Sequence, residues 1–174
     1  MMGRDVSGRK AVITGAASGI GAAAVARLRS DGVDVLAVDI VEAGLAGTHN
    51  LVADLGDDAA FAEIAACAQA KLGAVDILIN NAGVCPAGPF DDMSDAMWHQ
   101  ALAINVTAVM KLSRALLPML RKSAYPRVIN TGSILSRYGD AGLVAYSMSK
   151  HAVLGLTRAL ASELGPEGVT VNCV

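Results

Sequence analysis

A short apolar run that leads directly into closely spaced glycines is the feature that most constrains the fold of this chain. The run covers residues 10–14, the glycines are Gly15, Gly19 and Gly21, and an alanine-rich helical pattern follows. A buried strand, a glycine-rich turn and a helix form the first unit of a dinucleotide-binding fold, with the helix N-terminus aimed at the pyrophosphate. Gly15 would permit the tight turn, Gly19 would let the backbone approach the phosphates, and Gly21 would let the helix pack closely.

The second apolar run ends in an acidic residue. It covers residues 33–39 and places Asp39 eighteen residues beyond Gly21. A carboxylate there can accept hydrogen bonds from both hydroxyls of an adenosine ribose, and it would repel a 2′-phosphate. No Arg or Lys lies between Gly15 and Gly21 to neutralise such a phosphate, so the sequence favours NAD over NADP. A solvated aspartate at a strand end is the alternative interpretation.

Tyr146 and Lys150 stand one helical turn apart, on the same face of a predicted helix. A free phenol has a pKa of about 10, so it needs a nearby positive charge before it can exchange protons at neutral pH. At roughly 5 Å and an effective dielectric constant of about 20, one ammonium favours the phenolate by ~3 kcal/mol, or roughly two pKa units. Chance spacing on an exposed helix face is the alternative, and the rest of the chain has to decide between them.

Apolar runs alternate with helical patterns along the chain. Strands are expected near Lys10, Val33, Asn50, Val75 and Arg127, and helices near Ile20, Ala59, Ala96 and Tyr146. This alternation predicts an α/β fold with a doubly wound parallel sheet of the Rossmann type, in three α/β/α layers. Right-handed crossovers would bring Gly15 and Asn81 to one crevice at the carboxyl ends of the first and fourth strands. Residues 84–95 read as a loop over that crevice.

The composition fits one domain with a large core. The chain has 174 residues, of which 53% are hydrophobic and 17% are charged, as is typical of parallel strands buried on both faces. A net charge of −2 gives no reason to expect a nucleic acid or an anionic membrane as a partner, and no uninterrupted apolar run approaches membrane-spanning length. The cysteines lack metal-like spacing and the histidines are scattered, so we expect reduced thiols, a cytoplasmic protein and no metal site.

With these features the chain resembles the short-chain dehydrogenase/reductase family from about Lys10 to its last residue. The glycine motif of the family is matched by residues 14–21, its Asn-Asn-Ala-Gly by residues 80–83, and its Tyr-x-x-x-Lys by Tyr146 and Lys150. The resemblance implies the catalytic residues Asn105, Ser133, Tyr146 and Lys150. It also implies the NAD-binding residues Gly15, Ser18, Gly19, Ile20, Gly21, Asp39, Asp54, Leu55, Asn81, Ala82, Gly83, Tyr146 and Lys150.

The resemblance also implies a role for each catalytic residue. Ser133 would hydrogen-bond the substrate oxygen while Tyr146 exchanges its proton. Lys150 would lower the phenol's pKa and hold the nicotinamide ribose, and the backbone of Asn105 would position a water of the proton relay. Taken alone, Ser133 would be a turn serine and Asn105 a local helix irregularity.

Two residues near Ser133 depart from the common family pattern. Gly132 stands where many members have a second serine or an alanine, and Ser136 stands where glycine is common. Both changes bear on the shape of the loop more than on the reaction. In the family the substrate pocket is formed by the loop after Gly83, by residues 134–143 and by a C-terminal region that this sequence does not include. Secondary alcohols on sugars, steroids, acyl thioesters and small polyols are therefore all open as substrates.

The function implied is that of an NAD-dependent oxidoreductase that interconverts a secondary alcohol and a ketone, as a homo-oligomer (a dimer or tetramer). A non-catalytic dinucleotide-binding protein, such as a redox sensor, is the alternative from another class, and a purely structural protein is a third. The presence of Asn105, Ser133, Tyr146 and Lys150 together argues against a binding module, because such a module has no need of a proton relay.

Residues 169–174 follow a Gly-Pro-Glu-Gly turn and predict a sixth parallel strand, inside which the sequence stops. A terminal carboxylate at the end of a strand buried on both faces costs free energy. Family members continue through a Pro-Gly turn, helices that cover the substrate and a seventh strand. We therefore expect residues 1–174 to form a single NAD-binding domain that lacks this C-terminal segment.

Overall fold

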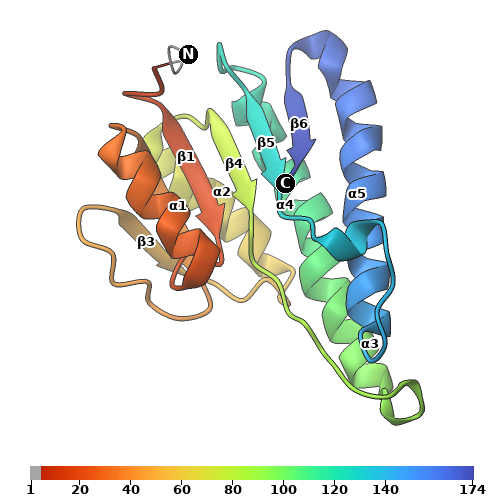
Figure 1. Cartoon of the computed structure of the whole chain (residues 1–174). Coiled ribbons are helices and arrows are strands. Elements are labelled where there is room, and N and C mark those ends of the chain that lie inside the picture. Colours follow the sequence, from red (N-terminus) through yellow and green to blue (C-terminus); the bar gives the residue numbers. More distant parts are fainter. Residues whose placement is uncertain (1–4) are drawn as a thin grey trace.

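The computed structural model describes residues 5–174, which contain one six-stranded parallel sheet. The strands are β1 (Lys10–Thr14), β2 (Asp34–Asp39), β3 (His49–Val52), β4 (Ile77–Asn80), β5 (Arg127–Asn130) and β6 (Thr170–Cys173). Their order in the sheet is β3-β2-β1-β4-β5-β6 (Figure 1). Strands β2 and β3 are added on one side of β1, and strands β4 to β6 are added on the other side, while all strands remain parallel. This order confirms the predicted doubly wound topology.

Helices cover both faces of the sheet. They are α1 (Gly19–Ser30), α2 (Ala59–Leu72), α3 (Asp95–Leu102), α4 (Ala108–Leu120) and α5 (Val144–Leu164), with a π-helical turn at Ala103–Thr107 and 3₁₀ turns at Phe90–Asp92, Ile134–Ser136 and Gly165–Glu167. In Figure 1, α1 lies in front of the sheet, and α2 and α4 lie behind it. The predicted three-layer α/β/α arrangement is thus confirmed.

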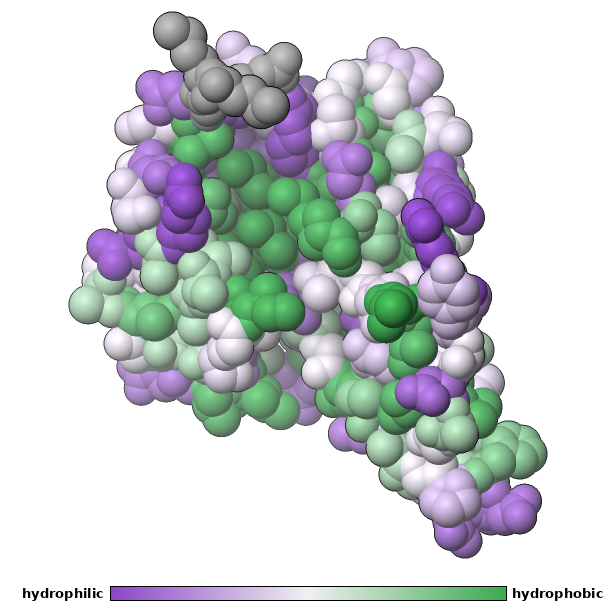
Figure 2. Space-filling model, viewed as in Figure 1, coloured by the Kyte–Doolittle hydropathy of each residue, from purple (hydrophilic) through white to green (hydrophobic). Residues whose placement is uncertain are grey.

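The core has two parts, one on each face of the sheet. Val12 of β1 packs into a cluster with residues of α2 and α4, whereas Ala11 and Ile13 pack into a second cluster with Val25 of α1. This alternation follows from the period of two in a strand, and it explains why a parallel strand buried on both faces is apolar throughout. Figure 2 shows that apolar surface remains between α1 and α5.

One helical stretch, Asp95–Leu120, is long and apolar enough to cross a membrane by length and composition alone. Its apolar side chains have another role in the fold, because Leu112, Leu116 and Leu120 are completely or almost completely buried in the core between the sheet, α2 and α5. Because 33% of the most apolar window of this stretch is buried, packing in the core accounts for part of its hydropathy.

A buried polar network joins β4 and β5 to α4 and α5. The Asn80 amide Nδ2 donates to Asn130 Oδ1 at 2.8 Å and to Ser113 Oγ of α4 at 3.1 Å, and Asn130 Nδ2 donates to Thr157 Oγ1 of α5 at 2.9 Å. All four residues are buried. Because a buried donor without a partner costs free energy, this chain of bonds specifies how α4 and α5 sit against the two strands.

Replacing Asn130 by Ala should therefore lower the free energy of unfolding by about 2 kcal/mol or more, since Asn80 and Thr157 both lose a buried partner. The matched control is Asn172→Ala, at the exposed position of β6 that pairs with Ile129; it should change stability by less than about 0.5 kcal/mol. Chemical denaturation of both variants measures the difference. Equal effects would show that the network adds nothing.

Candidate active site

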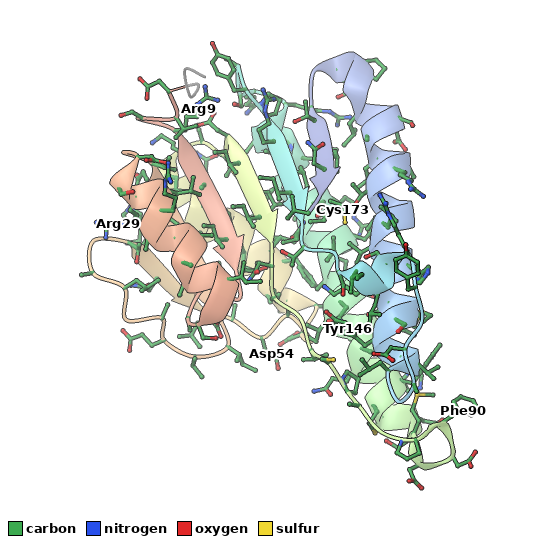
Figure 3. The ribbon with its side chains drawn as sticks, in the orientation of Figure 1. Arg9, Arg29, Asp54, Phe90, Tyr146 and Cys173 are labelled. Carbon is green, nitrogen blue, oxygen red and sulfur yellow. The ribbon has the colours of Figure 1, made fainter. Side chains whose placement is uncertain are left out.

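A cavity of about 820 Å³ opens at the carboxyl ends of the strands, where parallel α/β sheets bind ligands. The sequence-predicted residues that line it are Gly15, Ser18, Gly19, Ile20, Asp39, Asp54, Leu55, Asn81, Ala82, Gly83, Tyr146 and Lys150. Figure 3 shows Asp54 and Tyr146 at this end of the sheet, on different elements. Of the predicted residues, Gly21, Asn105 and Ser133 do not line this cavity.

Each glycine of the first turn is needed for a different structural reason. Gly15 has a φ of +64°, and a Cβ on it would lie 2.8 Å from Ala82 Cα. Gly19 has a φ of +53° and open space where a Cβ would be. Gly21 is buried, and a Cβ on it would lie 1.9 Å from the Gly15 carbonyl oxygen. The turn thus packs tightly against other parts of the protein at Gly15 and Gly21, whereas at Gly19 there is space for a ligand.

The N-terminus of α1 fits an anionic group. Ser18, the residue before the helix, has extended backbone and makes no side-chain cap, and the first turn of α1 carries no acidic residue. The backbone N–H groups of that turn therefore have no competing side-chain acceptor, and Ser18, Gly19 and Ile20 line the cavity. A pyrophosphate held by N–H groups and the helix dipole is compatible with this arrangement.

Asp39 is fixed by the same turn. Its carboxylate accepts a hydrogen bond from the Ala17 N–H at 2.8 Å, and its other oxygen faces the Val41 N–H at 3.4 Å. These bonds hold a negative charge at the carboxyl end of β2, beside the cavity.

Side-chain hydrogen bonds hold the ends of β1 and β4 together. Asn81 Nδ2 donates to the carbonyl oxygens of Thr14 and Gly15, each at 3.1 Å. Thr14 Oγ1 accepts from the N–H groups of Asn81 and Ala82, again at 3.1 Å. Gly15 and Asn81 therefore meet at one crevice, as predicted.

Tyr146 and Lys150 reach the cavity from α5. Lys150 is 4% exposed, its Nζ donates to the Thr131 carbonyl at 2.7 Å, and the same atom lies 5.6 Å from the centre of the Tyr146 ring. Burial lowers the pKa of Lys150, because desolvation penalises the ammonium. A ligand oxygen that accepts a hydrogen bond from Nζ would offset part of this penalty.

Asn105 lies in the π-helical turn between α3 and α4, so the helix irregularity considered for it is real. Its side chain makes two hydrogen bonds to the loop after β4. Oδ1 accepts from the Val84 N–H and Nδ2 donates to the Val84 carbonyl, both at 2.8 Å. Nδ2 also donates to Ser149 Oγ of α5 at 2.9 Å. Asn105 thus links the β4 loop to the helix that carries Tyr146 and Lys150.

Ser133 begins the 3₁₀ turn Ile134–Ser136, which packs against α5. It lines a second cavity of about 390 Å³, together with Leu154 of α5 and Cys173 at the end of β6. Figure 3 shows Cys173 near the end of β6 and Tyr146 lower on α5. Ser133 and Tyr146 therefore line different cavities in this structure.

The loop after β4 was expected to lie over the crevice, and this expectation is only partly correct. Of residues 84–95, only Val84 and Cys85 line the larger cavity. The Gly88 N–H bonds to the Gly142 carbonyl at 2.9 Å, and the chain then runs to Phe90 at the far tip of the molecule (Figure 3). The hydrogen bond ties the middle of the loop to the segment before α5.

Sequence reasoning missed several residues that line the larger cavity. They are Val38, Ile40, Ala53, Gly56, Val84, Cys85, His99, Gln100, Ala103, Ile104 and Thr131. Val38, Ile40, Ala53, Gly56 and Val84 are sequence neighbours of predicted residues, so their proximity to a motif could have indicated that they line the cavity. His99, Gln100 and Ile104 come from α3 and the π turn, where no motif marks them.

Fold and site together define a dinucleotide-binding α/β protein with a tyrosine–lysine pair at the cavity. The profile of the short chain dehydrogenase family matches residues 9–174. The chain belongs to the short-chain dehydrogenase family of oxidoreductases, whose members bind a nicotinamide dinucleotide.

Individual relatives agree with this assignment. The chain is 37% identical to nodulation protein G of Rhizobium sp. (strain N33), over 98% of this chain and 73% of that protein. It is 35% identical to D-xylose 1-dehydrogenase of Caulobacter vibrioides, over 98% of this chain and 71% of the relative. Like these two, "Short-chain reductase protein NovJ" of Streptomyces niveus is longer: its 36% identity extends over 94% of this chain but only 66% of that protein.

Solved structures are similar over the same region. A short-chain dehydrogenase from Streptomyces avermitilis superimposes with a TM-score of 0.90 at 29% identity, covering 96% of this chain and 64% of that one. A putative NAD(P)-dependent gluconate 5-dehydrogenase from Beutenbergia cavernae, solved with bound NADP at low occupancy, gives 0.89 at 37% identity, covering 97% and 72%. The chain thus spans about two thirds to three quarters of the length of its relatives.

Gly21→Ala tests the closed side of the glycine turn. A methyl group 1.9 Å from a backbone oxygen has to displace α1 from β1, so unfolding should become easier by more than about 2 kcal/mol. Ala23→Ser, at an exposed position on the same helix, should cost about 0.5 kcal/mol from helix propensity alone. Thermal unfolding of both variants provides the comparison. A Gly21→Ala protein as stable as the control would contradict the packing described.

Proposed function

We propose that the protein is an NAD-dependent oxidoreductase that interconverts a secondary alcohol and a ketone. The observation that carries this proposal is that Tyr146 and Lys150 line the same cavity as the glycine turn and Asp39. A helix N-terminus open to an anion, a carboxylate at the next strand end and a buried ammonium lie along one cavity. When bound, NAD would supply the hydride-transfer chemistry.

The residues divide into binding and chemical groups. The backbone from Gly15 to Ile20 would hold the pyrophosphate, Asp39 would hold the adenosine ribose, and Asp54 and Leu55 would contact the adenine. The strand end Asn81–Gly83 and Lys150 would hold the nicotinamide half. Lys150 already has one hydrogen bond to Thr131, and an ammonium carries three donors, so it has donors left for ribose hydroxyls.

Tyr146 would take the proton from an alcohol, or return it to a ketone. An ammonium 5.6 Å from the Tyr146 ring favours the negative charge that develops on the phenol oxygen during this transfer. Ser133 would donate a hydrogen bond to the substrate oxygen. Asn105, whose side chain is fully used by Val84 and Ser149, would act in the proton relay through its backbone.

Three relatives give probes for the substrate. By their names they act on D-xylose, on gluconate and on 3-oxoacyl groups carried by a protein. These three compound classes, tested with NAD and NADH by absorbance, form the first panel. A chain that binds NAD but turns over no alcohol or ketone in a broad panel would support the binding-protein alternative instead. The proposal also includes a homo-oligomer, a dimer or tetramer, which the family resemblance supports, and a cytoplasmic location, which the spacing of the cysteines supports.

The first functional prediction concerns the choice of cofactor. Wild-type protein should bind NAD at least about tenfold more tightly than NADP, because the Asp39 carboxylate would repel a 2′-phosphate. Asp39→Ser should reduce or abolish this preference by strengthening NADP binding. Asp34→Asn, at the other end of β2 beside His49, should leave it unchanged. Calorimetric titration of both cofactors measures the ratio; tighter binding of NADP to wild type would refute the assignment.

The second functional prediction concerns the proton-transfer group. Tyr146→Phe should lower kcat about 100-fold or more, because the hydroxyl carries the proton, while the Kd for NAD stays within about twofold. Tyr125→Phe is the matched control, since this ring stacks on the Arg9 guanidinium, 4.0 Å from its centre, at the amino end of the sheet. Steady-state kinetics and an NAD titration separate the two effects. Near-normal turnover by Tyr146→Phe would place the base elsewhere.

A further inference from the structure

The two departures from the family pattern near Ser133 touch each other in the structure. A Cβ on Gly132 would lie 3.2 Å from Ser136 Oγ, 2.6 Å from Cys173 Sγ and 3.1 Å from the Val174 carbonyl oxygen. The space that a side chain at position 132 needs is therefore already occupied. Gly132 and Ser136 form one arrangement, in which the hydroxyl of the second residue fills space left by the first.

The hydroxyl of Ser136 also makes a directed contact. Ser136 is 6% exposed, and its Oγ accepts a hydrogen bond from the Ser133 N–H at 3.1 Å. In the reverse direction, the Leu135 N–H donates to Ser133 Oγ at 3.1 Å. Together these bonds form a capping box around the 3₁₀ turn. A glycine at position 136 would leave the Ser133 N–H without this acceptor.

The capping box decides what the Ser133 hydroxyl can do. Its oxygen is engaged as an acceptor by the Leu135 N–H, and a serine hydroxyl has one hydrogen to donate. That hydrogen remains available for an acceptor outside the turn, such as a substrate oxygen on which negative charge develops. The Ser136 contact holds the Ser133 backbone extended, with φ −166° and ψ 163°, and so fixes the direction from which Oγ projects.

We propose that Ser136 is a positioning residue that acts through Ser133: its hydroxyl anchors the Ser133 N–H and so orients the Ser133 hydroxyl as a hydrogen-bond donor to the substrate oxygen. The proposal rests on the catalytic role proposed above for Ser133. According to this proposal, Ser136 fixes the conformation of the turn that begins at Ser133, and Gly132 leaves the space that the Ser136 hydroxyl occupies.

A double-mutant cycle on the full chain tests this proposal. Ser133→Ala, Ser136→Ala and the double variant are compared with wild type, using NAD and whichever alcohol of the D-xylose, gluconate and hydroxyacyl panel wild type oxidises. Ser136→Ala should lower kcat about tenfold, with the Kd for NAD unchanged, and should cause no further fall once Ser133 is Ala. Additive effects, or an unchanged kcat in Ser136→Ala, would overturn the proposal.

Two further variants separate hydrogen bonding from packing. Ser136→Cys keeps the shape but offers only a weak acceptor, so it should resemble Ser136→Ala. Ser147→Ala is the matched control, because Ser147 is also buried, at 7% exposure, and its Oγ has no hydrogen-bond partner within residues 5–174. It should leave kcat and the melting temperature unchanged. Wild-type activity in Ser136→Cys would show that only space filling matters and would overturn the proposal.

Amide hydrogen exchange gives a readout that does not depend on turnover. Exchange of the Ser133 N–H, followed by NMR, should accelerate about tenfold or more in Ser136→Ala and remain unchanged in Ser147→Ala. Unchanged protection in Ser136→Ala would overturn the contact itself. If wild type binds NAD but oxidises no alcohol, the proposed function fails and the catalytic part of this proposal fails with it, while the exchange data still decide whether Ser136 anchors Ser133.

Discussion

The hydrogen bonds between the ends of β1 and β4 are the constraint on which the rest of the site depends. The two strands pair up to Ile13 and Ile79, and beyond this point the chain turns to opposite faces of the sheet. Backbone groups at such a division have lost their ladder partners. Thr14 and Asn81 supply replacements through their side chains. The glycine turn is thereby held at a fixed place relative to the strand end that faces α5.

Lys150 shows that the site is built at some cost to the folded state. Its ammonium is buried beside Tyr146, with the Thr131 carbonyl as its hydrogen-bond acceptor in the structure. An apolar residue at this position of α5 would avoid the desolvation penalty. A lysine is retained there although packing alone would not select it, and this supports a chemical role more strongly than the spacing of Tyr146 and Lys150 does by itself.

Sequence alone identified the parts of the site that depend on local geometry. The turn at Gly15, the acid at the end of β2 and the helical pair on α5 follow from short-range rules, and the cavity contains all of them. Contacts between distant segments could not be predicted in this way. The hydrogen bonds between Asn105 and Val84 join residues that are 21 positions apart in the sequence, and nothing in the local sequence specifies them. From the sequence, Ser136 could be recognised only as a difference from the common family pattern. Its hydrogen bond with Ser133 depends on the conformation of the 3₁₀ turn, which the structure shows.

The π-helical turn at Ala103–Thr107 has a consequence for how the long helical segment is oriented. A π turn accommodates one more residue than an α-turn, so the side chains after it are rotated about the helix axis relative to those before it. This phase shift lets α4 present its apolar stripe to the sheet and α2 while α3 packs on α5. A single residue removed from the turn would bring the two halves into one phase. One of the two contacts, with the sheet or with α5, would then be lost.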